Sequence, residues 1–356
     1  MLVFLFAIAL SASIALAQNP LTPAPPQNPP ASQASGGQQQ QPQQQQQAPP
    51  AQQPGQQPKE IPTIRTTVSL VHLVATVTDR RHNFVTDLEK SDFRVQEDGV
   101  TQEIRSFGRE TDLPLRIGLL LDTSNSIRPR LNFEQEAAID FLTGVLRRNK
   151  DMAFLMTFDN EPEIIQDFTQ DVSVLSAAIR RQRAGGGTAL HDAIFKAADK
   201  ITNPPLPKTG SQEVRRVLVV ISDGDDNLSD HALSDAIEAA IRAEAAIYSI
   251  STNTDWLSLS GSAPRKMHLE PGDKVLEQFA EQSGGRVFYP YKVEDLEQSF
   301  VDIGAELRSQ YFIAYAPTNP QTNGRYRKIV VDTDRKGLTV RTRKGYYATS
   351  SPAGAN

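Results

Sequence analysis

Between residues 115 and 307, short apolar segments alternate with segments of helical periodicity, and this alternation restricts the fold more than any other feature. The apolar segments show no polar–apolar alternation, as expected of strands that helices cover on both faces. The candidate strands are residues 116–121, 152–158, 214–221, 245–251 and 286–289, and the candidate helices are residues 133–146, 172–181, 189–201, 230–243, 273–282 and 293–307. We therefore expect an α/β fold built on a doubly wound, mostly parallel, Rossmann-like sheet.

The segments on either side of this region have a different pattern, one of short strands and tight turns. Before it, the candidate strands are residues 68–77, 84–85, 92–96 and 102–107, and after it they are residues 311–316, 326–332 and 338–344. Glu97-Asp98-Gly99 predicts a hairpin turn, because Gly99 is free to adopt a positive φ. Residues 63–110 alone are too few to bury much of a core, so we expect both flanks to form one small antiparallel β module.

The amino-terminal segment has the pattern of an export signal. Residues 2–16 are almost wholly apolar, and Ala15-Leu16-Ala17 fits a signal-peptidase site, although no Lys or Arg precedes the apolar run. The run is shorter than the ~18–20 residues that a membrane-spanning helix needs. We expect an exported protein, periplasmic or extracellular; the alternative is that the uncleaved segment anchors the chain to the membrane.

A tract rich in Gln and Pro follows, and it contains no charged residue before Lys59. Such a composition cannot bury a core, so we expect a disordered linker, with a spacer role favoured over a role in interaction. The predicted organisation is a signal peptide at 1–17, the linker at 18–62, a small β module at 63–112, the α/β domain at 113–308, carboxy-terminal strands at 309–348 and a disordered tail at 349–356.

Composition excludes several classes of function. The chain has no cysteine, which excludes disulfides, thiolate metal sites and cysteine nucleophiles. The net charge of −5 gives no reason to expect nucleic acid or an anionic membrane surface as a partner. No phosphate-binding loop or dinucleotide fingerprint occurs, so we expect no small-molecule cofactor.

Oxygen-bearing side chains follow two of the candidate strands. The apolar run that ends at Leu121 continues into Asp122-Thr123-Ser124-Asn125-Ser126, and the run that ends at Ile221 continues into Ser222-Asp223-Gly224. Gly185-Gly186-Gly187-Thr188 adds a glycine-rich loop with a further hydroxyl before a candidate helix. Ligands bind at the carboxyl ends of strands in doubly wound sheets, and Mg²⁺ prefers oxygen ligands. The three segments converge only if the two strands are neighbours; the alternative is that they are ordinary turn residues.

Together the three segments resemble the metal-ion-dependent adhesion site of von Willebrand factor A domains, over residues 114–308. The resemblance implies that one divalent cation, Mg²⁺ or else Mn²⁺ or Ca²⁺, is held by Asp122, Ser124, Ser126, Thr188 and Asp223, with Asp223 acting through water. The whole chain is also similar to the von Willebrand factor A-related proteins of acidobacteria and similar bacteria. That similarity rests on Val77-Thr78-Asp79, Phe93, Glu97-Asp98-Gly99 and the closing segment Arg343 to Tyr347.

Three other groups of residues have weaker chemical interpretations. Asp223-Gly224-Asp225-Asp226-Asn227 resembles a calcium loop in composition but lacks its ligand order, so a solvated turn is favoured. His191-Asp192 resembles part of a phosphohydrolase site, but we expect a role at the start of a helix. The loop at 252–272, which contains Trp256, is interpreted as packing on the domain rather than as a partner contact.

These observations predict an exported, non-enzymatic binding protein in which the metal engages an acidic group of a protein partner, in transient association with the cell envelope. One alternative is a structural or assembly protein of the envelope with a vestigial metal site. Another is a metal-assisted hydrolase, which lacks an evident general base and any G-x-S-x-G nucleophile motif.

Overall fold

The computed structural model describes residues 70–109, 113–203, 214–253, 269–290 and 293–349. The predicted signal peptide, the predicted linker, Trp256 and all but the first residue of the predicted tail lie outside these residues. Among the described helices, none has both the length and the apolar character that crossing a membrane requires.

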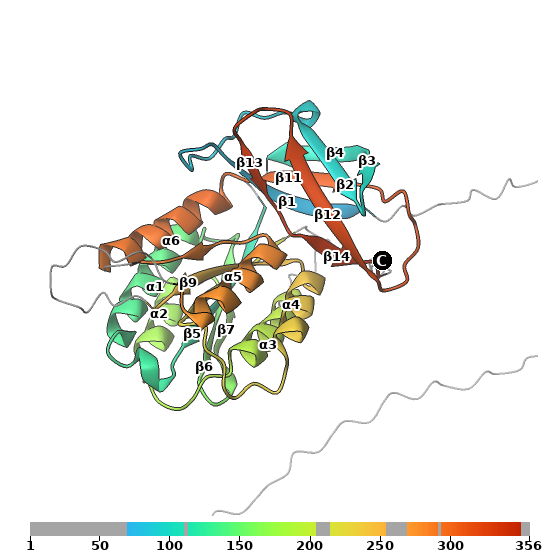
Figure 1. The fold of residues 1–356 in the computed structure, drawn as a ribbon. Helices are drawn as coiled ribbons and strands as arrows, with labels where there is room; N and C mark the ends of the chain where they lie inside the picture. The colour runs from blue at the N-terminus through green and yellow to red at the C-terminus, as the bar shows by residue number, and fades with distance from the viewer. Residues whose placement is uncertain (1–69, 110–112, 204–213, 254–268, 291–292, 350–356) are drawn as a thin grey trace, which may run out of the picture. The chain divides into compact units, whose positions relative to one another are not determined.

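A six-stranded sheet forms the centre of the α/β region (Figure 1), in the order β10-β9-β8-β5-β6-β7. Its strands are β5 (Leu115–Asp122), β6 (Met152–Phe158), β7 (Pro162–Thr169), β8 (Arg215–Ser222), β9 (Ala245–Ser251) and β10 (Val287–Phe288). Neighbouring strands are parallel except β6 and β7, which are antiparallel. The predicted mostly parallel sheet is therefore confirmed.

Six helices cover the two faces of this sheet: α1 (Leu131–Val145), α2 (Val172–Arg180), α3 (Leu190–Thr202), α4 (Leu233–Arg242), α5 (Pro271–Ser283) and α6 (Val293–Leu307). Leu119 and Leu121 of β5 pack in one core with α1, α2 and α6. Leu120 packs in the other core with α3, α4 and α5. Because both faces of β5 are buried, its sequence is apolar at consecutive positions rather than at alternate ones.

Strand β7 was not predicted from the sequence. It pairs with β6 at the edge of the sheet, and most of its side chains are only partly buried. An edge strand of this kind lacks the continuous apolar run that marks the central strands, and its first residue is Pro162, which is tolerated at a strand's start.

The two flanks pair with each other, as predicted, but they form two sheets rather than one. The first sheet has the order β13-β1-β11-β4 and the second the order β14-β12-β2-β3. From the amino-terminal flank come β1 (Val71–Thr78), β2 (Phe93–Glu97), β3 (Val100–Gln102) and β4 (Ile104–Arg109), and from the carboxy-terminal flank come β11 (Tyr311–Tyr315), β12 (Tyr326–Thr333), β13 (Thr339–Arg341) and β14 (Gly345–Tyr347). Side chains of both sheets share one apolar core.

Local details of this β module differ from the predicted strands. Residues 84–85 contribute only an isolated bridge between Phe84 and Thr78. Residues 102–107 are divided between β3 and β4, and residues 338–344 cover only β13, while β14 begins at Gly345. Short strands that bend from one sheet to the next leave no periodicity long enough to separate them in the sequence.

The two sequence motifs of the flanks, Glu97-Asp98-Gly99 and the closing segment 343–347, contact each other inside the β module. The Glu97 carboxylate pairs with Arg327 at 2.8 Å and accepts hydrogen bonds from Tyr315 at 2.8 Å and Tyr346 at 3.0 Å. Asp98 and Gly99 both have positive φ, 49° and 82°, which confirms the predicted hairpin turn. A buried charge needs a partner and further hydrogen bonds, and Glu97 has both.

Candidate metal centre

The strands that carry the predicted ligands are neighbours, as convergence requires. β5 and β8 are parallel, and Leu121 is the register partner of Ile221. Asp122 is therefore the last residue of β5, next to Ser222, the last residue of β8. The 3-10 turn Asn125–Ile127 follows and brings Ser126 back toward the end of β8.

Hydrogen bonds link four of the five predicted ligands. Ser126 Oγ donates to Asp223 Oδ2 at 2.8 Å and lies 3.0 Å from Ser124 Oγ. The Ser124 backbone N–H donates to Asp122 Oδ1 at 2.8 Å, and Ser222 Oγ donates to Asp122 Oδ2 at 2.7 Å. Ser222 is a positioning residue that sequence reasoning did not single out.

Backbone contacts place the Thr188 loop beside the other two loops. Gly185 N–H donates to Thr123 O at 2.8 Å, and Asn125 N–H donates to Gly186 O at 3.3 Å. On its other side, Thr188 N–H donates to Asn227 Oδ1 at 3.0 Å. Thr188 is buried and thus fixed between the Asp122 loop and the loop after Asp223.

A close backbone approach fixes the Asp223 loop. Gly224 has a φ of 81°, and a Cβ on it would lie 2.2 Å from Gly272 O in the first turn of α5. Asn253 Nδ2 donates to Asp223 O at 2.7 Å, which ties the same loop to the end of β9. The loop needs glycine at position 224 for both its conformation and its packing.

Three carboxyl groups at or near the centre have raised pKa values. Burial raises the pKa of Asp122 to about 6, although hydrogen bonds from Ser222 and Ser124 oppose the rise. Burial raises the pKa of Glu134, in the first turn of α1, to about 8; Arg130 opposes this rise, whereas repulsion from Asp122 and Asp223 adds to it. Burial and repulsion from Asp223 also raise the pKa of Asp225.

Glu134 is the residue near this centre that sequence reasoning missed. It is 1% exposed, and neither carboxyl oxygen has a hydrogen-bond partner among the described residues. Its signal in the sequence is a glutamate one turn after Arg130, at a position on the buried face of an amphipathic helix. Such a group is costly to ionise unless positive charge lies nearby.

The oxygens gathered here suit a hard divalent cation. Two carboxylates and three hydroxyls come from three loops, and Mg²⁺ takes oxygen ligands while retaining water. Among the described residues, no group of three His, Cys, Asp or Glu side chains could hold a metal ion. A cation here would therefore depend on the serine and threonine hydroxyls, as the predicted ligand set requires.

The turn after Asp223 is exposed at Asp225 and Asn227, as expected of a solvated turn, and it also makes hydrogen bonds to the start of α3. Asp226 Oδ2 accepts hydrogen bonds from the backbone N–H of His191 at 2.8 Å and from Ser229 Oγ at 2.6 Å. His231, which the sequence did not connect with His191-Asp192, has its Nδ1 2.7 Å from Asp192 Oδ1. The carboxylates of Asp192 and Asp226 thus hold the start of α3 against this turn, consistent with the predicted helix-start role.

Comparisons with known proteins found a matching family model and similar solved structures. Residues 117–225 match the family model described as von Willebrand factor type A domain. Similar solved structures include a von Willebrand factor type A protein from Catenulispora acidiphila, at 14% identity over 73% of this chain and 74% of that one, with a TM-score of 0.44. BatB from Bacteroides thetaiotaomicron is 16% identical over 54% of this chain and 99% of its own, with a TM-score of 0.41.

A third similar structure is the vWF domain of the type V pili tip protein Mfa5 from Porphyromonas gingivalis, 14% identical over 54% of this chain and 94% of that domain, with a TM-score of 0.41. No functionally curated protein matches the sequence. The matched residues include most of β5, all of β6 and β8, and all five predicted ligand positions. This protein therefore contains a von Willebrand factor type A domain.

Proposed function

We propose that this protein is an exported binding module in which one divalent cation, Mg²⁺ in the first instance, engages an acidic group of a protein partner. Asp122, Ser124, Ser126, Thr188 and Asp223 hold the cation. The observation that carries the proposal is the hydrogen-bonded series from Asp223 through Ser126 to Ser124, at the ends of neighbouring strands.

The charge of the ligand set favours an acidic partner. Asp122 and Asp223 supply the only two carboxylates of the set, and the other three ligands are neutral hydroxyls. A cation with few anionic ligands keeps its affinity for a further carboxylate, whereas a site saturated with carboxylates does not. The partner's acidic side chain would complete the coordination of the ion.

Exposure around the site suits a macromolecular partner. Asp122 is fully buried, whereas Ser126 and Asn125 are exposed, so the site opens on the side of Ser126. Leu228 is 47% exposed and packs over Gly187, where a Cβ would lie 2.5 Å from the Leu228 side chain. An apolar side chain beside the metal gives a partner surface to bury around the ionic contact.

We infer a non-enzymatic role because the two histidines near the site are already engaged, and because Glu134, whose carboxyl group has no hydrogen-bond partner among the described residues, is only 1% exposed and out of reach of a substrate. His231 lies against Asp192, and His191 lies between Asp226 and the carbonyl oxygen of His231, at 3.3 Å from the latter. Export rests on the apolar amino-terminal segment and its Ala15-Leu16-Ala17 cleavage pattern.

Isothermal titration with Mg²⁺ tests the metal site. We expect binding to the wild type and none to Asp122→Ala, with circular dichroism confirming that the variant is folded. Asp122→Asn keeps the shape of the side chain and is expected to bind at least tenfold more weakly, because one charged ligand is lost. Asp140→Ala, at an exposed position of α1, is the matched control. Equal Mg²⁺ affinity in wild type and both Asp122 variants would refute the proposed ligand set.

Capture of partners from an envelope extract tests the binding role. We expect protein capture that EDTA abolishes, that Mg²⁺ restores and that Asp122→Ala loses. Capture of the same proteins with and without EDTA would contradict metal-dependent binding and favour an assembly role for the β module.

A further inference from the structure

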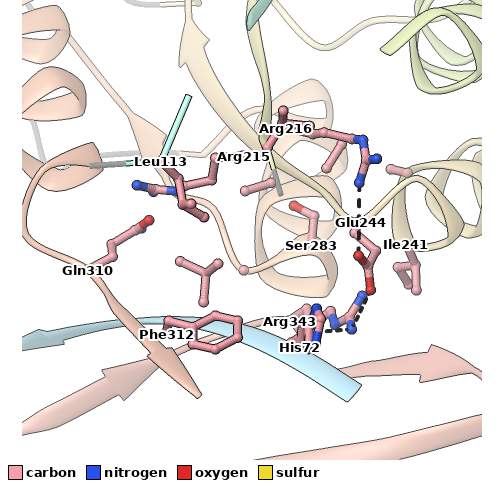
Figure 2. A pocket seen from close by; sticks show the side chains of 16 residues that line it. His72, Leu113, Arg215, Arg216, Ile241, Glu244, Ser283, Gln310, Phe312 and Arg343 are labelled. Carbon is pink, nitrogen blue, oxygen red and sulfur yellow. Dashed lines mark hydrogen bonds and ion pairs between the residues drawn. The ribbon is translucent and has the colours of Figure 1, made fainter. Parts of the chain in front are cut away.

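A cavity of about 260 Å³ lies at the amino-terminal ends of β8 and β9, whereas the metal centre lies at the carboxyl ends of the strands. The first residues of β8 and the turn between α4 and β9 line one side of it (Figure 2). β1 and β11 of the β module, together with Arg343, line the other side. The metal centre lies at the carboxyl end of β8, so the two features are separated by the length of that strand.

The charged groups that line the cavity are predominantly positive. Three guanidinium groups, those of Arg215, Arg216 and Arg343, line the cavity together with one carboxylate, that of Glu244, and Arg215 also donates a hydrogen bond to the carbonyl oxygen of Leu307. Arg343 pairs with Glu244 at 3.0 Å, and Arg216 lies 3.9 Å from the same carboxylate. With one carboxylate for three guanidinium groups, the lining favours an anion in the cavity.

The backbone at Glu244 is unusual for a glutamate. Its φ is 52°, in the left-handed region that favours glycine, at the turn between α4 and β9. The position thus holds a carboxylate between two arginines against the preference of its backbone. Unfavourable backbone conformations of this kind cluster at binding sites.

The rest of the lining is apolar, and the volume limits the ligand. Val74, Ile241 and Phe312 give the cavity a hydrophobic surface beside the arginines. At ~30 Å³ for each water of liquid, the volume corresponds to about nine water molecules, or a ligand of about ten non-hydrogen atoms. Pockets that combine an apolar lining with a few polar groups are typical of small-molecule sites.

We infer that this cavity binds a small monocarboxylate with an apolar body, about the size of phenylacetate. Its carboxylate pairs with the guanidinium groups of Arg216 and Arg343, and its apolar body packs on Phe312 and Ile241. Because Arg216 and Ile241 belong to the α/β region and Arg343 and Phe312 to the β module, a bound ligand contacts both. The site is independent of the metal centre.

Calorimetric titration with phenylacetate in the presence of EDTA tests this site, because EDTA prevents a carboxylate from binding through a metal. We expect saturable binding of phenylacetate, and none of neutral phenylacetamide or of sulfate. Asp122→Ala is expected to bind phenylacetate as the wild type does, which separates this site from the proposed metal site. Equal binding of the amide, binding of sulfate alone, or no binding at about 10 mM phenylacetate would overturn the inference.

Two variants distinguish a ligand-binding site from a cluster of charged residues that only stabilises the fold. Arg216→Met keeps most of the side-chain volume and is expected to weaken phenylacetate binding by about ten- to a hundredfold, the usual effect of losing a charged hydrogen bond. Glu244→Gly removes the competing carboxylate, suits the positive φ, and is expected to strengthen binding about threefold or more. Arg105→Met, on the exposed strand β4, is the control. Unchanged affinity in both cavity variants would refute the site.

Discussion

Replacing Glu134 by Gln should make the metal-free protein less sensitive to pH. Glu134 is buried in the first turn of α1 without a hydrogen-bond partner among the described residues, and burial raises its pKa from 4.5 to about 8. Arg130 opposes this rise, and Asp122 and Asp223 add to it. Glutamine has nearly the same shape and cannot ionise, so the substitution removes the titration while it conserves the packing.

The sign of the pH dependence of stability follows from the direction in which the pKa of Glu134 is shifted. A carboxyl group whose pKa is higher in the folded than in the unfolded state binds its proton more tightly when folded. It contributes stability that is fully present below pH 4.5 and is lost as the pH rises toward 8. At ~1.36 kcal/mol for each pH unit, a rise from 4.5 to about 8 corresponds to about 5 kcal/mol at most, of which about 3–4 kcal/mol is lost between pH 5 and pH 8.

Urea denaturation in EDTA at pH 5, 6, 7 and 8 measures this difference. The stability of Glu134→Gln relative to the wild type should increase steadily over this range, by about 3–4 kcal/mol in total. The slope with pH is the readout, because a constant offset only reports the change of side chain. Glu136→Gln is the control: Glu136 is exposed on the same helix, and its hydrogen bond with Arg180 lowers its pKa. Parallel pH profiles for wild type and Glu134→Gln would refute the reasoning.

Three further predictions concern the metal, the Asp223 loop and the β module. Mg²⁺ binding at pH 7 should release protons, because a cation lowers the raised pKa values of the buried carboxyl groups at the centre. Calorimetric titration in buffers of different ionisation enthalpy should therefore give binding heats that depend on the buffer. Gly224→Ala should destabilise the fold by about 2–4 kcal/mol in thermal denaturation, since its Cβ would lie 2.2 Å from a backbone oxygen at a φ of 81°. Arg327→Met should destabilise the fold by about 3–5 kcal/mol in urea denaturation, because the buried charge of Glu97 would lose its ion-pair partner. The double variant with Glu97→Leu should recover most of that loss.

The features that sequence reasoning predicted are those in which adjacent residues share one environment. β5 is buried along its whole length, so its apolar run predicted a central strand, and the polar residues that follow marked its carboxyl end. The glycine-rich loop before Thr188 was recognisable because its three glycines are consecutive in the sequence. The convergence of the loops then depended only on β5 and β8 being neighbours, which the sheet order confirms.

The features it missed arise from residues far apart in the chain or from a single position on a helix. The cavity combines His72, Arg216, Glu244 and Arg343, and no local pattern connects these positions. Glu134 looks like any polar residue of a helix until the structure shows that it lies on the buried face. Edge strand β7, partly exposed on both faces, lacked the apolar run by which its neighbours were found.

Burial of acidic groups connects the stability of this domain with its proposed function. Asp122, Asp223 and Glu134 lie in an interior where ionised carboxylates lack the solvation of water, and their mutual repulsion raises the pKa values of Asp122 and Glu134. In the metal-free protein this arrangement is destabilising near neutral pH. A divalent cation held by the proposed ligands would supply the missing positive charge, so the interactions that destabilise the metal-free fold would contribute to the affinity for the ion. The proposed centre would gain its affinity from the fold around it rather than from a large number of charged ligands, and the ion would then be able to bind a carboxylate from outside.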